Sequence, residues 1–202
     1  MKKKDIKLFF KAVSEGDFNK VSELVDNNME FLTICNVTPP KKDDGQSGLQ
    51  VSLKTGNFEI AKFLINRGAD VNFIEDSEIN EWTAPVLHDC IRATIFNCYT
   101  LQKDTKQFEK AFSLLELILS KKANPKAIDS YGNNSLHRAI MDARQMLDNP
   151  MTDFTNDILI KQLQRVFSEL IKAGADIKES SENRDSAEEL YFNFKLEKYN
   201  LL

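Results

Sequence analysis

Histidines are the first residues of this chain to consider for chemistry, and only two occur, His88 and His137. A catalytic pair would need a nucleophile or a carboxylate held against each imidazole ring. The sequence supplies no such group at a fixed spacing, since both histidines stand in the same local pattern, Leu-His-x-Cys or Leu-His-x-Ala. Two equivalent positions of this kind indicate a structural role, and we expect no catalytic residue.

The cysteines Cys35, Cys90 and Cys98 are the other candidates for a nucleophile or a metal ligand. A thiol nucleophile needs a base and an activating positive charge, and a zinc site needs spacings such as C-x-x-C or H-x-x-x-H. Neither occurs. The Gly-Lys-Ser or Gly-Lys-Thr sequence of a phosphate-binding loop is also missing. We therefore expect a non-enzymatic protein without metal or cofactor.

The composition is that of an ordinary globular protein, with 42% apolar and 29% charged residues. A formal net charge of −4 offers no electrostatic attraction to nucleic acid or to an anionic membrane. The apolar run near the start stops at Phe10, which is too short for a signal sequence. No stretch approaches the roughly 18 apolar residues of a membrane span. With an odd number of cysteines, which favours reduced thiols, we expect a cytoplasmic protein.

Residues 44–73 have the clearest periodicity in the chain. Apolar residues around Leu49 fall on one face of a short helix, Gly56 and Asn57 break it, and residues 60–65 form the apolar side of a second helix that Gly68 ends. The segment S-G-L-Q-V-S and the ending G-A-D-V-N resemble the T-P-L-H-x-A and closing motifs of an ankyrin repeat. The resemblance implies a β-turn hairpin followed by two antiparallel helices.

Weaker copies of this pattern extend along the chain, so we expect one all-α domain, an ankyrin-repeat solenoid with short β-turn hairpins. The expected repeats span 5–28, 44–73, 81–127 and 129–178, and a capping helix lies within 183–199, starting at Asp185 or Ser186. Residues 29–43 read as a longer hairpin loop, and the third repeat has a one-residue slip at Ala84 and Pro85. The resemblance gives His88 and His137 a hydrogen-bonding role between neighbouring repeats.

The third and fourth repeats are longer than the second. The interval from Leu49 to Gly68 is 19 residues. The equivalent intervals are 35 residues from Leu87 to Lys122 and 38 residues from Leu136 to Gly174. Polar loops are one explanation, but the additional residues are largely apolar with helical spacing. We therefore expect lengthened helices of four to five turns that bury each other, with breaks near 103–105 and 149–153.

Ankyrin proteins grip partners with the outward positions of their inner helices and with their hairpin tips, and the resemblance implies the same here. It assigns partner binding to the helix residues Lys54, Asp89, Arg92, Arg138, Met141 and Asp142, and to Trp82 and Tyr131 at or near hairpin tips. Trp82 could instead pack onto the start of the third repeat. The mixed charges of this set predict a folded protein partner with complementary charges.

The expected function is a protein-binding module that is a monomer when free and binds neither nucleic acid nor membrane. An inhibitor of the immunity-protein type would account for the two enlarged repeats. The alternatives are an adaptor, a structural subunit of a larger assembly or, less in keeping with the sequence, an enzyme with its site in the added residues, which contain no histidine and no clustered carboxylates.

Overall fold

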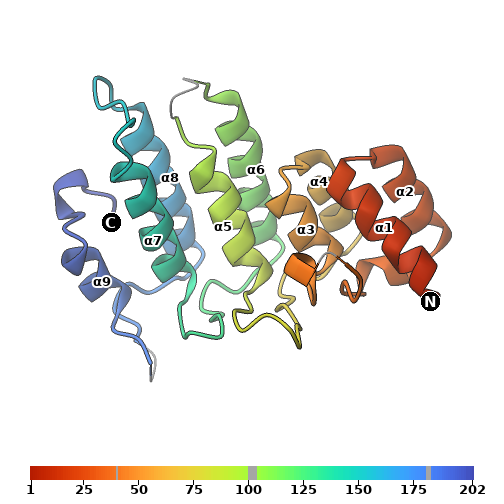
Figure 1. The fold of residues 1–202 in the computed structure, drawn as a ribbon. Helices are drawn as coiled ribbons and strands as arrows, with labels where there is room; N and C mark the ends of the chain where they lie inside the picture. The colour runs from red at the N-terminus through yellow and green to blue at the C-terminus, as the bar shows by residue number, and fades with distance from the viewer. Residues whose placement is uncertain (40, 100–103, 181–182) are drawn as a thin grey trace.

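The computed structural model describes residues 1–39, 41–99, 104–180 and 183–202 (Figure 1). Its helices form two layers that run side by side along the molecule. The inner layer consists of α1 (Lys3–Glu15), α3 (Gly48–Lys54), α5 (Val86–Phe96), α7 (Ser135–Leu147) and α9 (Ala187–Asn193). The outer layer consists of α2 (Phe18–Asn27), α4 (Phe58–Asn66), α6 (Lys106–Ser120) and α8 (Ile158–Lys172).

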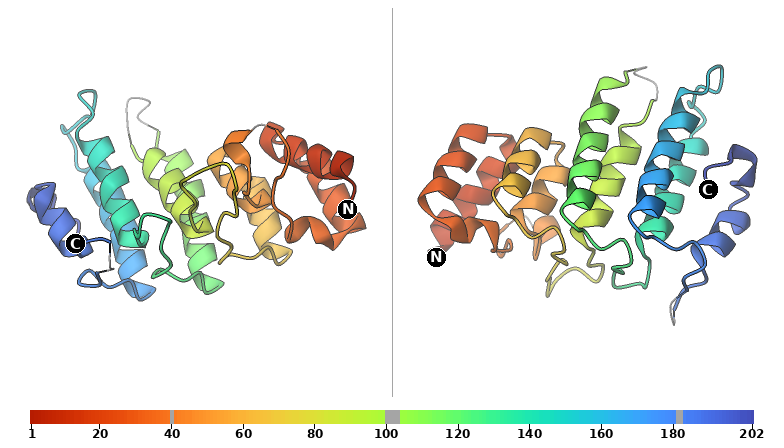
Figure 2. Two further views of the ribbon diagram at one scale, coloured as in Figure 1. Left: turned by 60° about the horizontal axis from the view of Figure 1, so that its bottom comes forward. Right: turned by 180° about the vertical axis from the view of Figure 1, so that it is seen from behind.

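Successive helices contact each other within each layer, α1 to α3 to α5 to α7 to α9 and α2 to α4 to α6 to α8, so the helix pairs stack as in a solenoid (Figures 1 and 2). The β pairing consists of isolated bridges, among them Cys35 with Ser47 and Ile74 with Pro85, and Arg184 is also a bridge residue. Short 3-10 turns lie at Met29–Leu32, Lys41–Asp43 and Glu197–Tyr199. The expected all-α repeat solenoid is confirmed, whereas its division into four repeats and a cap within one domain stays a prediction.

Polar residues at the inner-helix starts set the register of the helix pairs. Ser47, Asn134 and Ser186 each cap an inner helix by accepting a hydrogen bond from its first turn. Pro85 takes the same place before α5 without a side-chain cap. The one-residue slip expected at Ala84 and Pro85 is wrong for the helix itself, because Pro85 stands three residues before His88, as Ser47 does before Gln50 and Asn134 before His137.

The loops that lead from an outer helix to the next inner helix lie against one another. We number them loop 1 (33–47), loop 2 (67–85), loop 3 (121–134) and loop 4 (173–186). Gly45 in loop 1 has φ 74°, and a Cβ there would stand 2.4 Å from the backbone of Asp76 in loop 2. Only glycine permits this approach, in which the Asp76 amide donates to the Gly45 carbonyl at 3.0 Å.

The core is a continuous apolar layer between the helix pairs. At its N-terminal end, Phe9 of α1 packs against Phe31 with ring centroids 4.8 Å apart, so residues 29–32 cover the first helix pair as the sequence predicts. Gly48 lies against the same phenylalanine, since a Cβ there would stand 2.8 Å from the Phe9 ring. The absence of a side chain at Gly48 thus sets how closely α1 and α3 pack.

The additional residues of the longer pairs divide between helix and link. α6 and α8 have 15 residues each, against 9 in α4, and so reach the expected four turns. α5 and α7 have only 11 and 13 residues, against 7 in α3, so four to five turns was wrong for the inner helices. The remaining described residues lie between the helices of each pair, at 97–99 and 104–105 in the third pair and at 148–157 in the fourth, and the last of these segments contains the predicted break at Pro150. The predicted break at Lys103 lies outside the described residues.

The lengthened helices bury each other's additional turns. Arg165 of α8 forms a two-pronged ion pair with Glu109 of α6 and stacks over Phe112, 4.2 Å from the ring centroid. Thr94 of α5 donates to the Ala111 carbonyl of α6 at 3.3 Å. The contacts of Arg165 join the two enlarged pairs, and that of Thr94 joins the two helices of one pair, so the additional turns are packed both between and within pairs. Among the described residues, no helix combines the length and apolar character required to cross a membrane.

Candidate functional site

On the inner-helix face, hollows lie between neighbouring inner helices, and three of them are formed by described residues. The first hollow, about 220 Å³, lies between α1 and α3; the second, about 320 Å³, between α3 and α5; the third, about 610 Å³, between α7 and α9. Lys54 and Arg92 line the second and Met141 lines the third. Each of these residues stands seven positions after its helix cap, so the hollows share one face.

Two acidic residues predicted for this face are buried instead. Asp89 is 7% exposed and accepts a hydrogen bond from the Gln50 side chain at 2.9 Å. Asp142 is 0% exposed and pairs with the Arg138 guanidinium through bonds of 2.6 and 3.0 Å. Burial raises the pKa of Asp142 and raises the pKa of Asp89 to about 7.

The expected surface of mixed charge is therefore wrong. The carboxylates of Asp89 and Asp142 point into the protein, and Arg138, only 11% exposed at its side chain, is held with Asp142. In the central part of the inner-helix face, the predicted binding side chains that reach solvent are those of Lys54, Arg92 and Met141.

Lys54 and Arg92 face the same hollow but differ in their partners. The ammonium of Lys54 donates to the Lys42 carbonyl at 2.8 Å and to the buried Asp43 carboxylate at 3.0 Å, and so fastens loop 1 to α3. Arg92 is half-buried and its guanidinium lies over the Phe96 ring, 5.4 Å from the centroid. Lys54 is thus a structural cation, and Arg92 is the more available one.

His137 joins neighbouring helix pairs, as the sequence predicts. Its Nε2 lies 2.7 Å from the Asp185 carbonyl of loop 4 and its Nδ1 lies 2.8 Å from the Asn134 side chain. Gln50 occupies the same position in α3 and donates to the Ala84 carbonyl of loop 2 at 3.0 Å. A side chain at this position therefore binds the carbonyl just before the next inner helix.

His88 departs from this pattern. It is 1% exposed, and its ring nitrogens have no short hydrogen bond like those of His137, only a weaker interaction with the Ala127 backbone of loop 3. Burial lowers the pKa of His88 to about 4, so its ring is neutral at pH 7. No hydroxyl, thiol or carboxylate is hydrogen-bonded to it, and it has the surroundings of a packed side chain rather than of a general base.

Trp82 bridges two loops. Its indole Nε1 donates to Asp129 of loop 3 at 3.0 Å, and the residue is half-buried. Burial alone would raise the pKa of Asp129, but hydrogen bonds from Asn133 and Trp82 hold it below its usual value. The packing alternative for Trp82 therefore describes the structure better than a free contact residue. Tyr131, in contrast, is 47% exposed in loop 3.

Exposed apolar side chains lie on three successive loops, and of these the sequence pattern had assigned Tyr131 to partner binding but not the other four. We call them the loop-tip residues: Val37, Ile74, Ile79, Ile128 and Tyr131. The yellow and green loops that carry four of them emerge at the same end of the helices (Figure 1), and the Ser130 amide of loop 3 donates to the Thr83 carbonyl of loop 2 at 3.0 Å. Large apolar residues within otherwise polar loops were the available signal in the sequence.

The cysteines offer no reactive thiolate. Burial raises the pKa of the Cys90 and Cys98 thiols far above the physiological range and raises that of Cys35 as well. All three are free. Within the described ranges, no group of three histidine, cysteine or acidic residues is placed to hold a metal ion.

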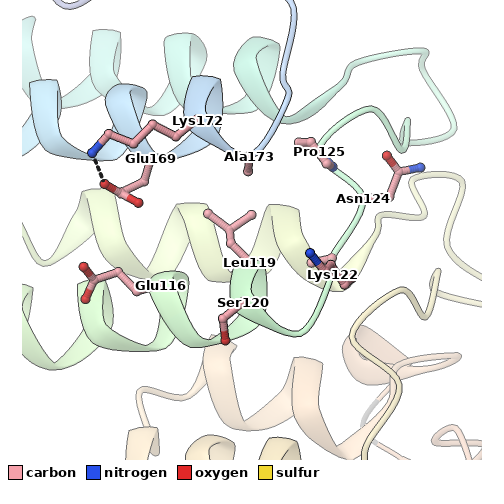
Figure 3. A pocket seen from close by; sticks show the side chains of 10 residues that line it. Glu116, Leu119, Ser120, Lys122, Asn124, Pro125, Glu169, Lys172 and Ala173 are labelled. Carbon is pink, nitrogen blue, oxygen red and sulfur yellow. Dashed lines mark hydrogen bonds and ion pairs between the residues drawn. The ribbon is translucent and has the colours of Figure 1, made fainter.

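A further hollow, about 640 Å³, lies on the outer layer between the C-terminal ends of α6 and α8 (Figure 3). Its charged side chains stand at the surface, and Lys172 pairs with Glu169 at 2.7 Å. The Lys172 side chain is 66% exposed, so this pair can be made or broken at little cost in free energy. The hollow therefore offers no fixed charge to orient a ligand.

The comparisons with known proteins identify one segment. Residues 44–76 match the family model of the ankyrin repeat, a stretch that holds the end of loop 1, α3, α4 and the first part of loop 2. No curated protein matched the chain.

Proposed function

We propose that this ankyrin-repeat solenoid is a non-enzymatic module that binds a partner protein with its inner-helix face and its loop tips. Ankyrin repeats in general mediate protein–protein interaction, and residues 44–76 are such a repeat. Tight interfaces concentrate their binding energy in a few apolar or arginine side chains beside pockets. This chain carries exposed apolar side chains on three successive loops and an arginine, Arg92, in a hollow of the inner-helix face.

The loop-tip residues are the observation that carries the proposal. Each leaves a large apolar side chain in water, at 47% exposure or more. Single exposed apolar residues are common, but their presence on three consecutive loops that are hydrogen-bonded to one another makes a candidate interface. Burying such side chains against a partner removes apolar surface from water at about 25 cal/mol per Å².

The two histidines support the non-enzymatic part of the proposal. His137 is bound on both ring nitrogens by Asn134 and the Asp185 carbonyl, and His88 is neutral and enclosed. Neither is free to accept a substrate proton. We also propose that the free chain is a cytoplasmic monomer, which suits three unpaired thiols.

The experiment is affinity capture with matched variants. In the loop variant, Ile79→Ser and Tyr131→Ala remove two loop-tip residues. In the control, Ile171→Ser removes an apolar side chain of α8 that is 42% exposed. A partner retained by the parent and by the control but lost from the loop variant supports the proposal. Retention by the loop variant with loss from the control contradicts it.

The narrower prediction of an inhibitor of the immunity type has its own measurement. If the captured partner is an enzyme or toxin, its activity should fall in proportion to the complex formed. A partner that stays fully active when bound would favour the adaptor or scaffold alternative and would leave the binding proposal intact.

A further inference from the structure

We propose that the second hollow is a receptor for an acidic side chain of the partner, with the Arg92 guanidinium as the group that binds it. The inference rests on the proposed protein-binding function and identifies the chemistry of the partner at one point of the surface. The site consists of Arg92, the Phe96 ring beneath it and the apolar wall formed by Leu53 and Ala93.

Arg92 differs from the other arginines of the chain. Six arginines are present, and within the described ranges Arg92 is the one whose guanidinium has neither an ion pair nor a hydrogen-bond acceptor. The other five each bind a carboxylate or a carbonyl: Arg67 with Asp26, Arg138 with Asp142, Arg144 with Asp148, Arg165 with Glu109, and Arg184 with the Tyr131 carbonyl. A guanidinium presents several N–H donors in a rigid fork. The donors of Arg92 are therefore available to an acceptor from another molecule.

The neighbouring carboxylates do not accept hydrogen bonds from the Arg92 guanidinium. Asp89 lies one helical turn before Arg92 but is buried and bound to Gln50. Asp142 is engaged by both prongs of Arg138. The charge of Arg92 favours the ionised form of both carboxylates, but neither carboxylate is hydrogen-bonded to its guanidinium.

The hollow is shaped to admit a side chain. Its volume of about 320 Å³ lies at the small end of the range for ligand pockets. At its rim, a Cβ built on Gly56 would meet nothing within 4 Å, so the entrance is open. Phe96 is 38% exposed and supports the guanidinium from below, which reduces the side-chain entropy that Arg92 loses when it binds a carboxylate.

A carboxylate of a protein suits this site better than the phosphates of a nucleic acid. Nucleic-acid binding depends on several cations that contact successive phosphates, whereas here Lys54, the other cation of the hollow, is engaged by Asp43 and the Lys42 carbonyl. The net charge of −4 also disfavours a polyanion. One free guanidinium beside an apolar wall matches a single Asp or Glu next to an apolar residue.

The test is an NMR titration of the ¹⁵N-labelled full chain that follows the Arg92 Nε–Hε resonance. The probe is the peptide acetyl-GSEFESG-amide, and its isostere acetyl-GSQFQSG-amide is the control. We expect the glutamate peptide to shift the Arg92 side-chain resonance and the Gly56 and Phe96 amides in a saturable manner. The glutamine peptide should shift them at least tenfold less at equal concentration.

Variants sharpen the assignment. Arg92→Gln should weaken binding of the glutamate peptide at least tenfold and change the melting temperature little, because in the free protein the guanidinium makes no hydrogen bond or ion pair and loses only its contact with the Phe96 ring. Arg92→Lys should bind with intermediate strength, since it keeps the charge and loses the fork. Arg144→Gln is the matched control: Arg144 also lies over a phenylalanine, Phe194 at 4.1 Å, but already pairs with Asp148. It should bind as the parent does.

Three outcomes would overturn the inference: equal shifts with both peptides, an unmoved Arg92 resonance, or an octathymidylate that moves it more than the glutamate peptide does. The titration of the parent decides this even if a variant unfolds. If the peptide fails while the loop variant still loses its captured partner, the inference falls and the proposed function stands. If the peptide binds Arg92 while the loop variant keeps its partner, the proposed function falls and the site stands.

Discussion

Gln50 of α3 donates its side-chain amide to the buried carboxylate of Asp89 in α5 at 2.9 Å, across the contact between two helix pairs. Burial raises the pKa of Asp89 to about 7, whereas in the unfolded chain this carboxyl titrates near 3.9. The folded protein thus holds a proton between about pH 4 and pH 7 that the unfolded chain releases. Stability from this proton is complete below about pH 4 and is lost as the pH rises to about 7.

The first prediction follows from this loss of stability with rising pH. Asp89→Asn keeps the size of the side chain and its hydrogen bond to Gln50 but cannot ionise. The variant should be more stable than the parent at pH 8 by at most about 4 kcal/mol, the equivalent of a shift of about three pKa units. At pH 4 the two should be nearly equal. Urea unfolding at both pH values measures the difference, and a larger advantage of the variant at pH 4 would contradict the account.

The second prediction concerns His137, which binds the Asp185 carbonyl at 2.7 Å. His137→Ala leaves that carbonyl and the Asn134 side chain without this partner, so the free energy of unfolding should fall by roughly 1–3 kcal/mol. Partner binding by the folded fraction should hardly change. A variant as stable as the parent that no longer binds or acts would instead give His137 a functional role.

The third prediction concerns the lengthened helices. In the free protein, the amides of α6 and α8 should exchange with deuterium as slowly as those of α4, because their additional turns are packed against one another. The link 148–157 should exchange rapidly. Mass spectrometry of peptide fragments resolves the two classes, and fast exchange throughout 106–112 and 158–163 would show that the helices are not stably formed there.

The architecture could be predicted because it depends on local patterns. The apolar period around Leu49, the helix end at Gly68 and the Leu-His-x-Ala motif at His137 all act within one helix pair, and each indicates the same unit. The lengthened helices could be predicted for the same reason, since an apolar stripe is visible in the sequence whether or not its partner helix is known.

The candidate site could not be predicted as well, because it depends on contacts between repeats. Asp89 is hidden by Gln50, which lies 39 residues away in the sequence, and Trp82 is anchored by Asp129, 47 residues away. Asp142 is buried with Arg138, a pair that a surface helix would also show. Because these carboxylates are buried, the surface lacks the expected negative charges, and the Arg92 guanidinium is left without an ion-pair partner.

The measurement that tests the central claim most directly is hydroxyl-radical footprinting of the complex with the captured partner. It reports which exposed side chains become covered. We predict that Tyr131, Ile79 and Phe96 lose most of their oxidation on binding, while Ile171 of the outer layer and Phe192 of the C-terminal cap, both exposed in the free protein, keep theirs. Protection of Ile171 with unchanged oxidation of Tyr131 and Phe96 would contradict binding by the inner-helix face and the loop tips.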